Sequence, residues 1–394
     1  MEMSDDPEIT DIVGNPDEYI METECSYNGT EYLHIKIYLI GVFGTMVALL
    51  NMFFNSFYTL VFVKNKSLRS SPLYYFGILA ILDIILAINY ILLMSVPVYF
   101  DQFGLLWLYH LFLGYLVPMM TISNTAMFGS MLLILMATVE RLLRTSKSPK
   151  VETFRHFLEG KRPVVCFICI SFAFLYKLCT YFELAHAENS NCTEWSRYDV
   201  IATPLAMHPD YRFWWMFLTR NVFDRVLPFI ALILMNVMII RTLKKEQNNN
   251  KSNLKDATRA LIALVSLYIV GQTLQVTITV WEFWSKPELE HNYAEVYSYI
   301  NDIMSLAVLI SSTIRFPVYC SCNQEIYDAS KFTYNELKAC FFASKKRNVE
   351  YLPITIKESS QKDPVYKSQI EEVQDNSLPE KDPSGDESTT TWML

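Results

Sequence analysis

The chain has 394 residues, of which 52% are hydrophobic and 14% aromatic, and its 33 basic and 41 acidic side chains give a formal net charge of −8. A chain this apolar is incompatible with a soluble globular protein unless long segments lie in lipid. The composition therefore predicts an integral membrane protein, and we expect no nucleic-acid partner.

Seven stretches with few charges are long enough to cross a bilayer, which takes roughly 20 residues of helix. Lipid offers no partner for unpaired backbone groups, and the stretches are too continuously apolar for the strands of a barrel, so each is predicted to be a helix. The spans are expected near residues 38–63, 73–99, 112–139, 163–185, 213–240, 260–284 and 296–320. The predicted fold class is all-α, a seven-transmembrane helix bundle over residues 38–320.

The charges that flank the spans predict how the chain is oriented. Basic residues concentrate after the first, third and fifth spans, at 64–69, 141–162 and 241–259, which indicates that these connections face the cytoplasm. The segment 1–37 contains ten acidic residues and one lysine, Lys36, and is predicted to be an extracellular tail. We expect a multi-pass protein of the plasma membrane without a cleaved signal peptide, whose first span serves as the anchor.

The segments predicted to be extracellular contain two kinds of modification site. Asn28 and Asn191 begin Asn-x-Thr triplets, so glycosylation is expected at both. Cys25 and Cys192 are the two cysteines that clearly lie outside, where the environment is oxidising. They are expected to form a disulfide that ties the tail to the loop above the bundle.

Two segments follow the seventh span. Residues 321–342 are predicted to form an amphipathic helix along the membrane surface. Its amphipathic stretch 323–338 is flanked by Cys320, Cys322 and Cys340, which are either palmitoylated or free thiols. Residues 343–394 are polar and predicted to be disordered, with serines and threonines available for phosphorylation. The terminal Trp392-Met393-Leu394 is compatible with binding to a PDZ domain.

Charged residues inside the spans indicate where signalling chemistry lies. Glu140 and Arg141 end the third span, where they either form a local salt bridge that can open or simply anchor the topology. Asp83 and Arg315 lie deep within the second and seventh spans. Because an unpaired intramembrane charge is costly and normally faces a partner inside the bundle, we predict an ion pair between these two residues.

Several motifs occur in the order found in one receptor family: Asn55, the run Leu79-Ala80-Ile81-Leu82-Asp83, Glu140-Arg141, Pro228 and Tyr319. In these residues the chain resembles the rhodopsin-like G protein-coupled receptors, over about residues 35–340. Pro228 followed by Asn236 and Ile239-Ile240-Arg241 is similar to the invertebrate FMRFamide-type neuropeptide receptors within that family.

The resemblance implies contacts with a heterotrimeric G protein through Arg141, Tyr319 and the fifth-to-sixth connection, a signalling role for Asn236, and arrestin binding to the tail. In relatives, the position of Asp83 helps to hold a sodium ion, and Arg315 is expected to replace that ion here. Three departures from the family pattern are a missing cysteine near Leu116, a missing proline near Leu274 in the sixth span, and the charged sequence Arg315-Phe316-Pro317-Val318-Tyr319 in the seventh.

The outer halves of the spans contain charges that are expected to line a water-filled pocket. Arg220 and Asp224 are one helical turn apart and either pair with each other or face a ligand. Glu282 and Asp302 have no such local partner.

The resemblance implies an amidated peptide ligand ending in Arg-Phe-amide. Carboxylates would bind its guanidinium, and Trp281 and Tyr297 its ring. These aromatic residues are alternatively an anchoring belt at the membrane interface.

Two other functions remain open: a chemoreceptor for small environmental molecules, and a multi-pass transporter or channel. The sequence contains no paired inverted halves of the kind found in many transporters. We expect no enzymatic activity, no metal site and no cofactor, because the sequence contains no cluster of the residue types that such chemistry requires.

Overall fold

The computed structural model describes residues 25, 27, 29–145, 149–246, 252–291 and 294–350. In chain order the elements are α1 (Leu33–Lys36), η1 (Ile37–Gly44), α2 (Thr45–Lys64), α3 (Lys66–Ser70), α4 (Tyr74–Tyr90), η2 (Ile91–Ser95), α5 (Val96–Phe103), α6 (Leu106–Thr145), α7 (Pro149–Gly160), α8 (Arg162–Lys177), η3 (Leu178–Phe182), β1 (Leu184–Glu188), η4 (Glu194–Ser196), β2 (Tyr198–Ala202), α9 (Pro204–Met207), η5 (Tyr211–Val226), α10 (Leu227–Glu246), α11 (Ser252–His291), α12 (Ala294–Cys322) and α13 (Gln324–Glu350).

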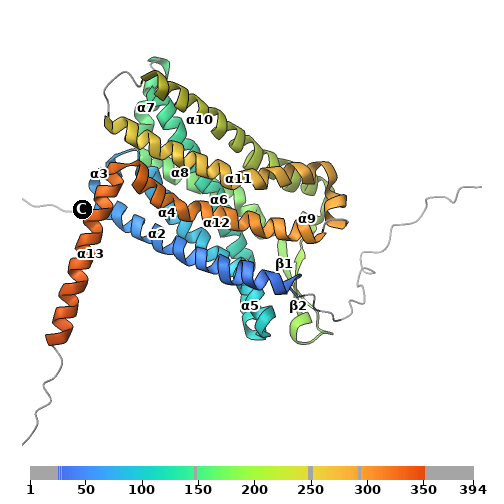
Figure 1. The fold of residues 1–394 in the computed structure, drawn as a ribbon. Coiled ribbons are helices and arrows are strands. Elements are labelled where there is room, and N and C mark those ends of the chain that lie inside the picture. The colour runs from blue at the N-terminus through green and yellow to red at the C-terminus, as the bar shows by residue number, and fades with distance from the viewer. Residues whose placement is uncertain are drawn as a thin grey trace, which may run out of the picture. The chain divides into compact units, whose positions relative to one another are not determined.

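Seven helical segments in the described part of the chain are long and apolar enough to cross a membrane. They are Leu33–Lys64, Tyr74–Phe103, Leu106–Arg144, Arg162–Phe182, Tyr211–Arg241, Thr258–Trp281 and Ala294–Cys322. Each overlaps one of the spans predicted from hydropathy, so the all-α, seven-helix fold class is confirmed. Figure 1 shows the long helices running side by side.

The outer surface of the bundle is apolar. Phe167 and Val270, for example, are 72% and 73% exposed. Helices that are apolar on all their faces belong in lipid or in the core of a large protein. These exposed side chains therefore mark the surface that contacts lipid, and the chain is a multi-pass membrane protein.

The bundle core lies where α2, α4, α6, α11 and α12 meet, around Tyr58, Leu79, Leu133 and Tyr319. Helices α2 and α4 approach closely at Gly77, because a Cβ atom there would overlap the ring of Phe62. Glycine at this position therefore sets how closely the two helices pack.

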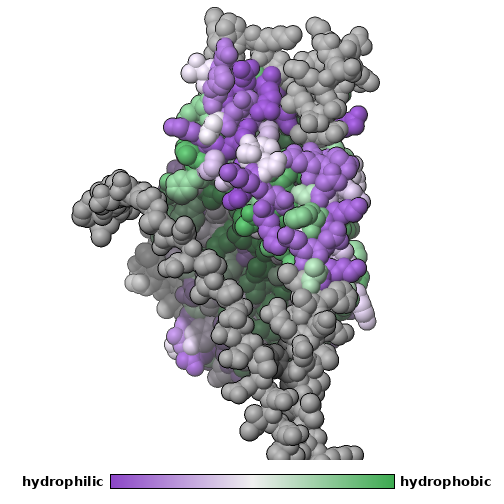
Figure 2. Space-filling model, turned by 90° about the vertical axis from the view of Figure 1, so that its left-hand side faces the viewer, coloured by the Kyte–Doolittle hydropathy of each residue, from purple (hydrophilic) through white to green (hydrophobic). Residues whose placement is uncertain are grey.

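The two ends of the bundle carry different elements. At one end, which we call the hairpin end, β1 and β2 pair antiparallel with Leu184 opposite Ala202 and Glu188 opposite Tyr198. Helices α3 and α7 lie at the other end, which we call the α7 end (Figure 1). Figure 2 looks onto the α7 end and shows hydrophilic side chains gathered there with hydrophobic ones between them.

The chain divides into two compact units, Met1–Cys340 and Phe341–Leu394. Helix α13 begins at Gln324 and continues to Glu350, so it includes residues 324–342 of the predicted amphipathic segment and also residues 343–350, for which the sequence predicted disorder, while residues 321 and 322 belong to α12. The sequence of α13 contains neither glycine nor proline, which explains how the helix continues. The rest of the predicted disordered tail, with its arrestin and PDZ motifs, lies outside the described residues.

Candidate functional site: buried ion pairs and two cavities in the bundle

An ion pair lies in the middle of the bundle. Arg315 of α12 donates from Nη1 to both carboxylate oxygens of Asp83 in α4, at 2.6 and 2.8 Å. The two side chains are 4% and 1% exposed. Both carboxylate oxygens thus accept a charge-assisted hydrogen bond from the same guanidinium nitrogen. The pair predicted from the sequence is therefore present, while its replacement of a sodium ion stays a prediction.

A polar network joins α2 to α12. Asn51 donates to the hydroxyl of Ser312, and Asn55 donates to Asn51 Oδ1 at 2.9 Å. All three side chains are buried, so these hydrogen bonds fix how the two helices face each other. Asn55 was singled out by the sequence motif, whereas Asn51 and Ser312 were not.

Two further ion pairs connect the end of the fourth span to the fifth. Lys177 pairs with Asp224, and Arg220 pairs with Glu183, which also accepts a hydrogen bond from Tyr211 at 2.7 Å. The local pairing of Arg220 with Asp224 considered from the sequence is therefore wrong. Pairing across the segments gives the buried Lys177 and Glu183 charge partners, whereas a local pair of Arg220 with Asp224 would leave them without these partners.

Two adjoining cavities lie among α4, α6, η5, α11 and α12. The first, which we call the polar cavity, has a volume of about 170 Å³ and is also lined by Lys177 at the end of α8. The second, which we call the apolar cavity, has a volume of about 320 Å³ and includes Leu93, Met94 and Met304 in its lining. Both cavities are lined by Gln275, among other shared residues, so they are neighbouring parts of one internal space.

The predicted ligand-binding residues are only partly brought together. Arg220 and Asp224 line the polar cavity, and so does Arg315. Asp302 lines neither cavity; it is buried, and its carboxylate lies 3.4 Å from Lys36 Nζ. Lys36 is thus the charge partner of Asp302 and comes from outside the seventh span. The sequence did not predict this ion pair.

The remaining ligand residues predicted from the sequence lie away from both cavities or are not described. Trp281 is 40% exposed and Tyr297 is partly buried, and neither residue lines the two cavities. The side chain of Glu282 lies outside the described residues. Binding of a ligand ring by Trp281 and Tyr297 therefore stays a prediction.

At the α7 end, Glu140 is the centre of a buried charge cluster. It accepts hydrogen bonds from Arg162 of α8, the closest at 2.8 Å, and lies 3.7 Å from Arg144. Arg162 also donates to the backbone oxygen of Ser70 at 2.8 Å. Arg162 and Arg144, which indicated only orientation in the sequence, are therefore charge partners of Glu140.

The other signalling residues predicted at this end are buried in the same region. Arg141 is 5% exposed and lines a small space together with Phe76. The ring of Phe76 stacks on Tyr319 with centroids 4.7 Å apart. Asn236 of α10 is buried and donates to Ser266 of α11 at 3.4 Å.

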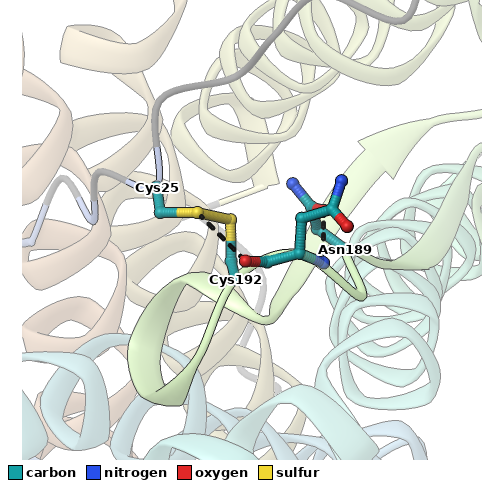
Figure 3. The surroundings of a disulfide bond; sticks show 4 residues. Cys25, Asn189 and Cys192 are labelled. Carbon is teal, nitrogen blue, oxygen red and sulfur yellow. Dashed lines mark hydrogen bonds between the residues drawn. A yellow bond between two sulfur atoms is a disulfide. The ribbon is translucent and has the colours of Figure 1, made fainter.

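The described residues before α1 are tied to the hairpin end of the bundle. Cys25 forms a disulfide with Cys192, as predicted (Figure 3). Tyr27 donates to Asp101 at 2.6 Å, and burial together with this carboxylate raises the pKa of Tyr27 above its ordinary value. Asn191, next to the disulfide, is exposed as glycosylation would require, whereas Asn28 lies outside the described residues.

No family model and no curated protein matches the chain. The class of protein therefore rests on the fold and composition, which define a multi-pass membrane protein with seven helical spans.

Proposed function

We propose that this chain is a cell-surface G protein-coupled receptor. The observation that carries the proposal is a continuous series of contacts from the cavities to the α7 end. Arg315 lines the polar cavity and binds Asp83. Four residues further along α12, Tyr319 stacks on Phe76, which lines the same small space as Arg141. A ligand that displaced Arg315 would thus act on α12 and on the surroundings of Arg141.

Such a series becomes a switch only if the bundle has two arrangements and the ligand binds one of them more tightly. The buried pairs supply elements that can be formed in one arrangement and broken in the other. In the proposed active arrangement Arg141, Tyr319 and the connection between α10 and α11 contact a heterotrimeric G protein. The hairpin end then faces the cell exterior, and the α7 end faces the cytoplasm.

For the ligand, the resemblance to FMRFamide-type receptors supports an amidated peptide. A second candidate, a chemoreceptor for small molecules, is favoured by the cavity volumes of about 170 and 320 Å³. Small-molecule sites typically have volumes of about 300–1,000 Å³, so these spaces suit a compact ligand or the end of a peptide.

The test is expression of the full chain with a promiscuous G protein reporter and a panel of amidated Arg-Phe peptides, repeated with Glu282→Gln and Asp302→Asn. A response that is lost in either variant, at unchanged surface expression, supports the peptide receptor. Silence to the peptides with a response to small molecules favours the chemoreceptor. Ligand-driven uptake or ion current without G protein activation would overturn the proposal in favour of a transporter or channel.

A further inference from the structure

The polar cavity has an uneven charge lining. Four cationic side chains contribute to it, Lys177, Arg220, Arg225 and Arg315, against a single carboxylate, that of Asp224. We infer that this cavity binds a carboxylate group of the ligand and that the adjoining apolar cavity binds the hydrophobic group attached to it. The inference rests on the proposed function, because it names the chemical class of ligand for the same site.

Two of the cations, Arg220 and Arg315, have hydrogen-bond donors without a partner among the described residues. A guanidinium offers five N–H groups. Arg220 donates only from Nη2, to Glu183, Thr180 and Cys179, so its Nε and Nη1 make no hydrogen bond within the described part of the protein. The bonds of Arg315 to Asp83 both come from Nη1, and its buried Nε has no partner among the described residues.

The carboxylates that neutralise these arginines lie behind them. Asp83 and Glu183 are 1% and 5% exposed and line neither cavity. A ligand in the polar cavity would therefore contact the cationic partner of these two pairs and not the anionic one, whereas Asp224, the partner of Lys177, lines the cavity itself. Charge-assisted hydrogen bonds to a carboxylate are the strongest that such a lining can make.

Neutral donors add to the same preference. Asn124, Gln272 and Gln275 line the polar cavity, and their amides make no hydrogen bond within the described residues. These side chains are partly buried, and a ligand carboxylate can accept hydrogen bonds from several of their amide groups at once.

The apolar cavity determines the rest of the ligand. Its lining includes Leu86, Leu93, Met94, Met304 and Val308, and Leu86 and Val308 also line the polar cavity. A hydrophobic group attached directly to the ligand carboxylate would therefore fill the apolar cavity. Either a small apolar carboxylic acid or a peptide with a free terminal carboxylate supplies this chemistry, whereas the guanidinium of an Arg-Phe-amide would meet four cations.

The experiment is binding to the purified full chain, measured by thermal stabilisation and by calorimetry. The first arm compares apolar monocarboxylates of increasing size, such as 4-phenylbutyrate, with the matching neutral amides. The second arm compares Arg-Phe peptides with a free carboxylate and with an amidated end. We expect the carboxylate form to bind at least about tenfold more tightly than its amide in one arm, which identifies the source of the carboxylate.

Variants distinguish ligand recognition from structural damage. Arg220→Gln combined with Glu183→Gln removes the pair without leaving a buried charge, and it should weaken carboxylate binding about tenfold or more. Glu183→Gln alone leaves Arg220 without its partner and should bind the carboxylate as tightly as the unmodified protein or more tightly. Gln275→Leu should weaken binding, and Arg197→Gln on the exposed hairpin should not change it.

Equal affinity for carboxylates and amides, or no binding of any carboxylate in the panel, would overturn the inference. So would weaker binding in Glu183→Gln than in the double variant. The binding experiment contains no G protein, so it tests the inference by itself. Carboxylate binding without a signalling response in the reporter assay would contradict the proposed function alone. A signalling response to amidated peptides without any preference for carboxylates would contradict the inference alone.

Discussion

The ion pair between Asp83 and Arg315 gives the sharpest prediction about stability. Its two side chains are 1% and 4% exposed, so replacing Arg315 by Met leaves a buried carboxylate without its charge partner. Removing one partner of a buried pair typically costs about 3–5 kcal/mol, whereas replacing both partners is often neutral or stabilising. We therefore expect Arg315→Met and Asp83→Asn each to be strongly destabilising, and the double variant to recover most of the loss.

The assay is thermal unfolding of the purified protein, followed with a thiol-reactive dye. For a domain of 150–250 residues, about 1 kcal/mol corresponds to roughly 2–4 °C in melting temperature, and larger proteins shift less. Each single variant should thus lower the melting temperature by about 5–10 °C. Lys64→Met is the matched control, because its pair with Glu336 is about 40% exposed and contributes little.

A double variant that is as unstable as the sum of the two single variants would refute this account. Additive effects are expected for residues that do not interact. They would mean that the two side chains do not depend on each other inside the bundle.

Three further predictions concern sodium, the disulfide and helix packing. Agonist binding to the unmodified protein should not change when NaCl replaces KCl, whereas agonist binding to Arg315→Asn should depend on sodium. The same response to the two salts in both proteins would contradict the idea that Arg315 replaces the ion. Cys192→Ser should lower the melting temperature, since a disulfide typically contributes about 2–4 kcal/mol. Cys169→Ser, the control, should leave it unchanged. In a reducing agent the melting temperatures of the two variants should be equal. Gly77→Ala should destabilise the protein by about 1–3 kcal/mol through overpacking. Gly114→Ala, with no atom within 4 Å of the new Cβ, should be neutral or stabilising. Equal melting temperatures of these two variants would show that the close approach of α2 and α4 is not required.

The spans and one of the ion pairs could be predicted because unpaired backbone groups and unpaired charges are both unfavourable in lipid. An apolar stretch of sufficient length must be helical in lipid. A charge within such a stretch needs a partner, which is why Asp83 and Arg315 could be matched without a structure. The disulfide could be predicted because Cys25 and Cys192 were the two cysteines expected outside.

The remaining ion pairs depend on how the helices rotate about their axes, which hydropathy does not determine. Lys177 and Glu183 lie within the predicted fourth span, so the argument applied to Arg315 would also have singled them out. Their pairing with Asp224 and Arg220, however, requires knowing which faces of the segments meet. In the same way Arg162 indicated only orientation in the sequence, whereas the structure places it against Glu140.

In the proposed receptor, ligand binding among the spans leads to G protein activation at the α7 end. The most direct measurement is agonist-stimulated nucleotide exchange on a heterotrimeric G protein, in membranes that contain the full chain. We predict stimulated exchange that is abolished by Arg141→Ala at unchanged agonist binding, and that is retained by Arg155→Ala in α7. Agonist binding without stimulated exchange, or exchange that is the same in Arg141→Ala, would contradict it.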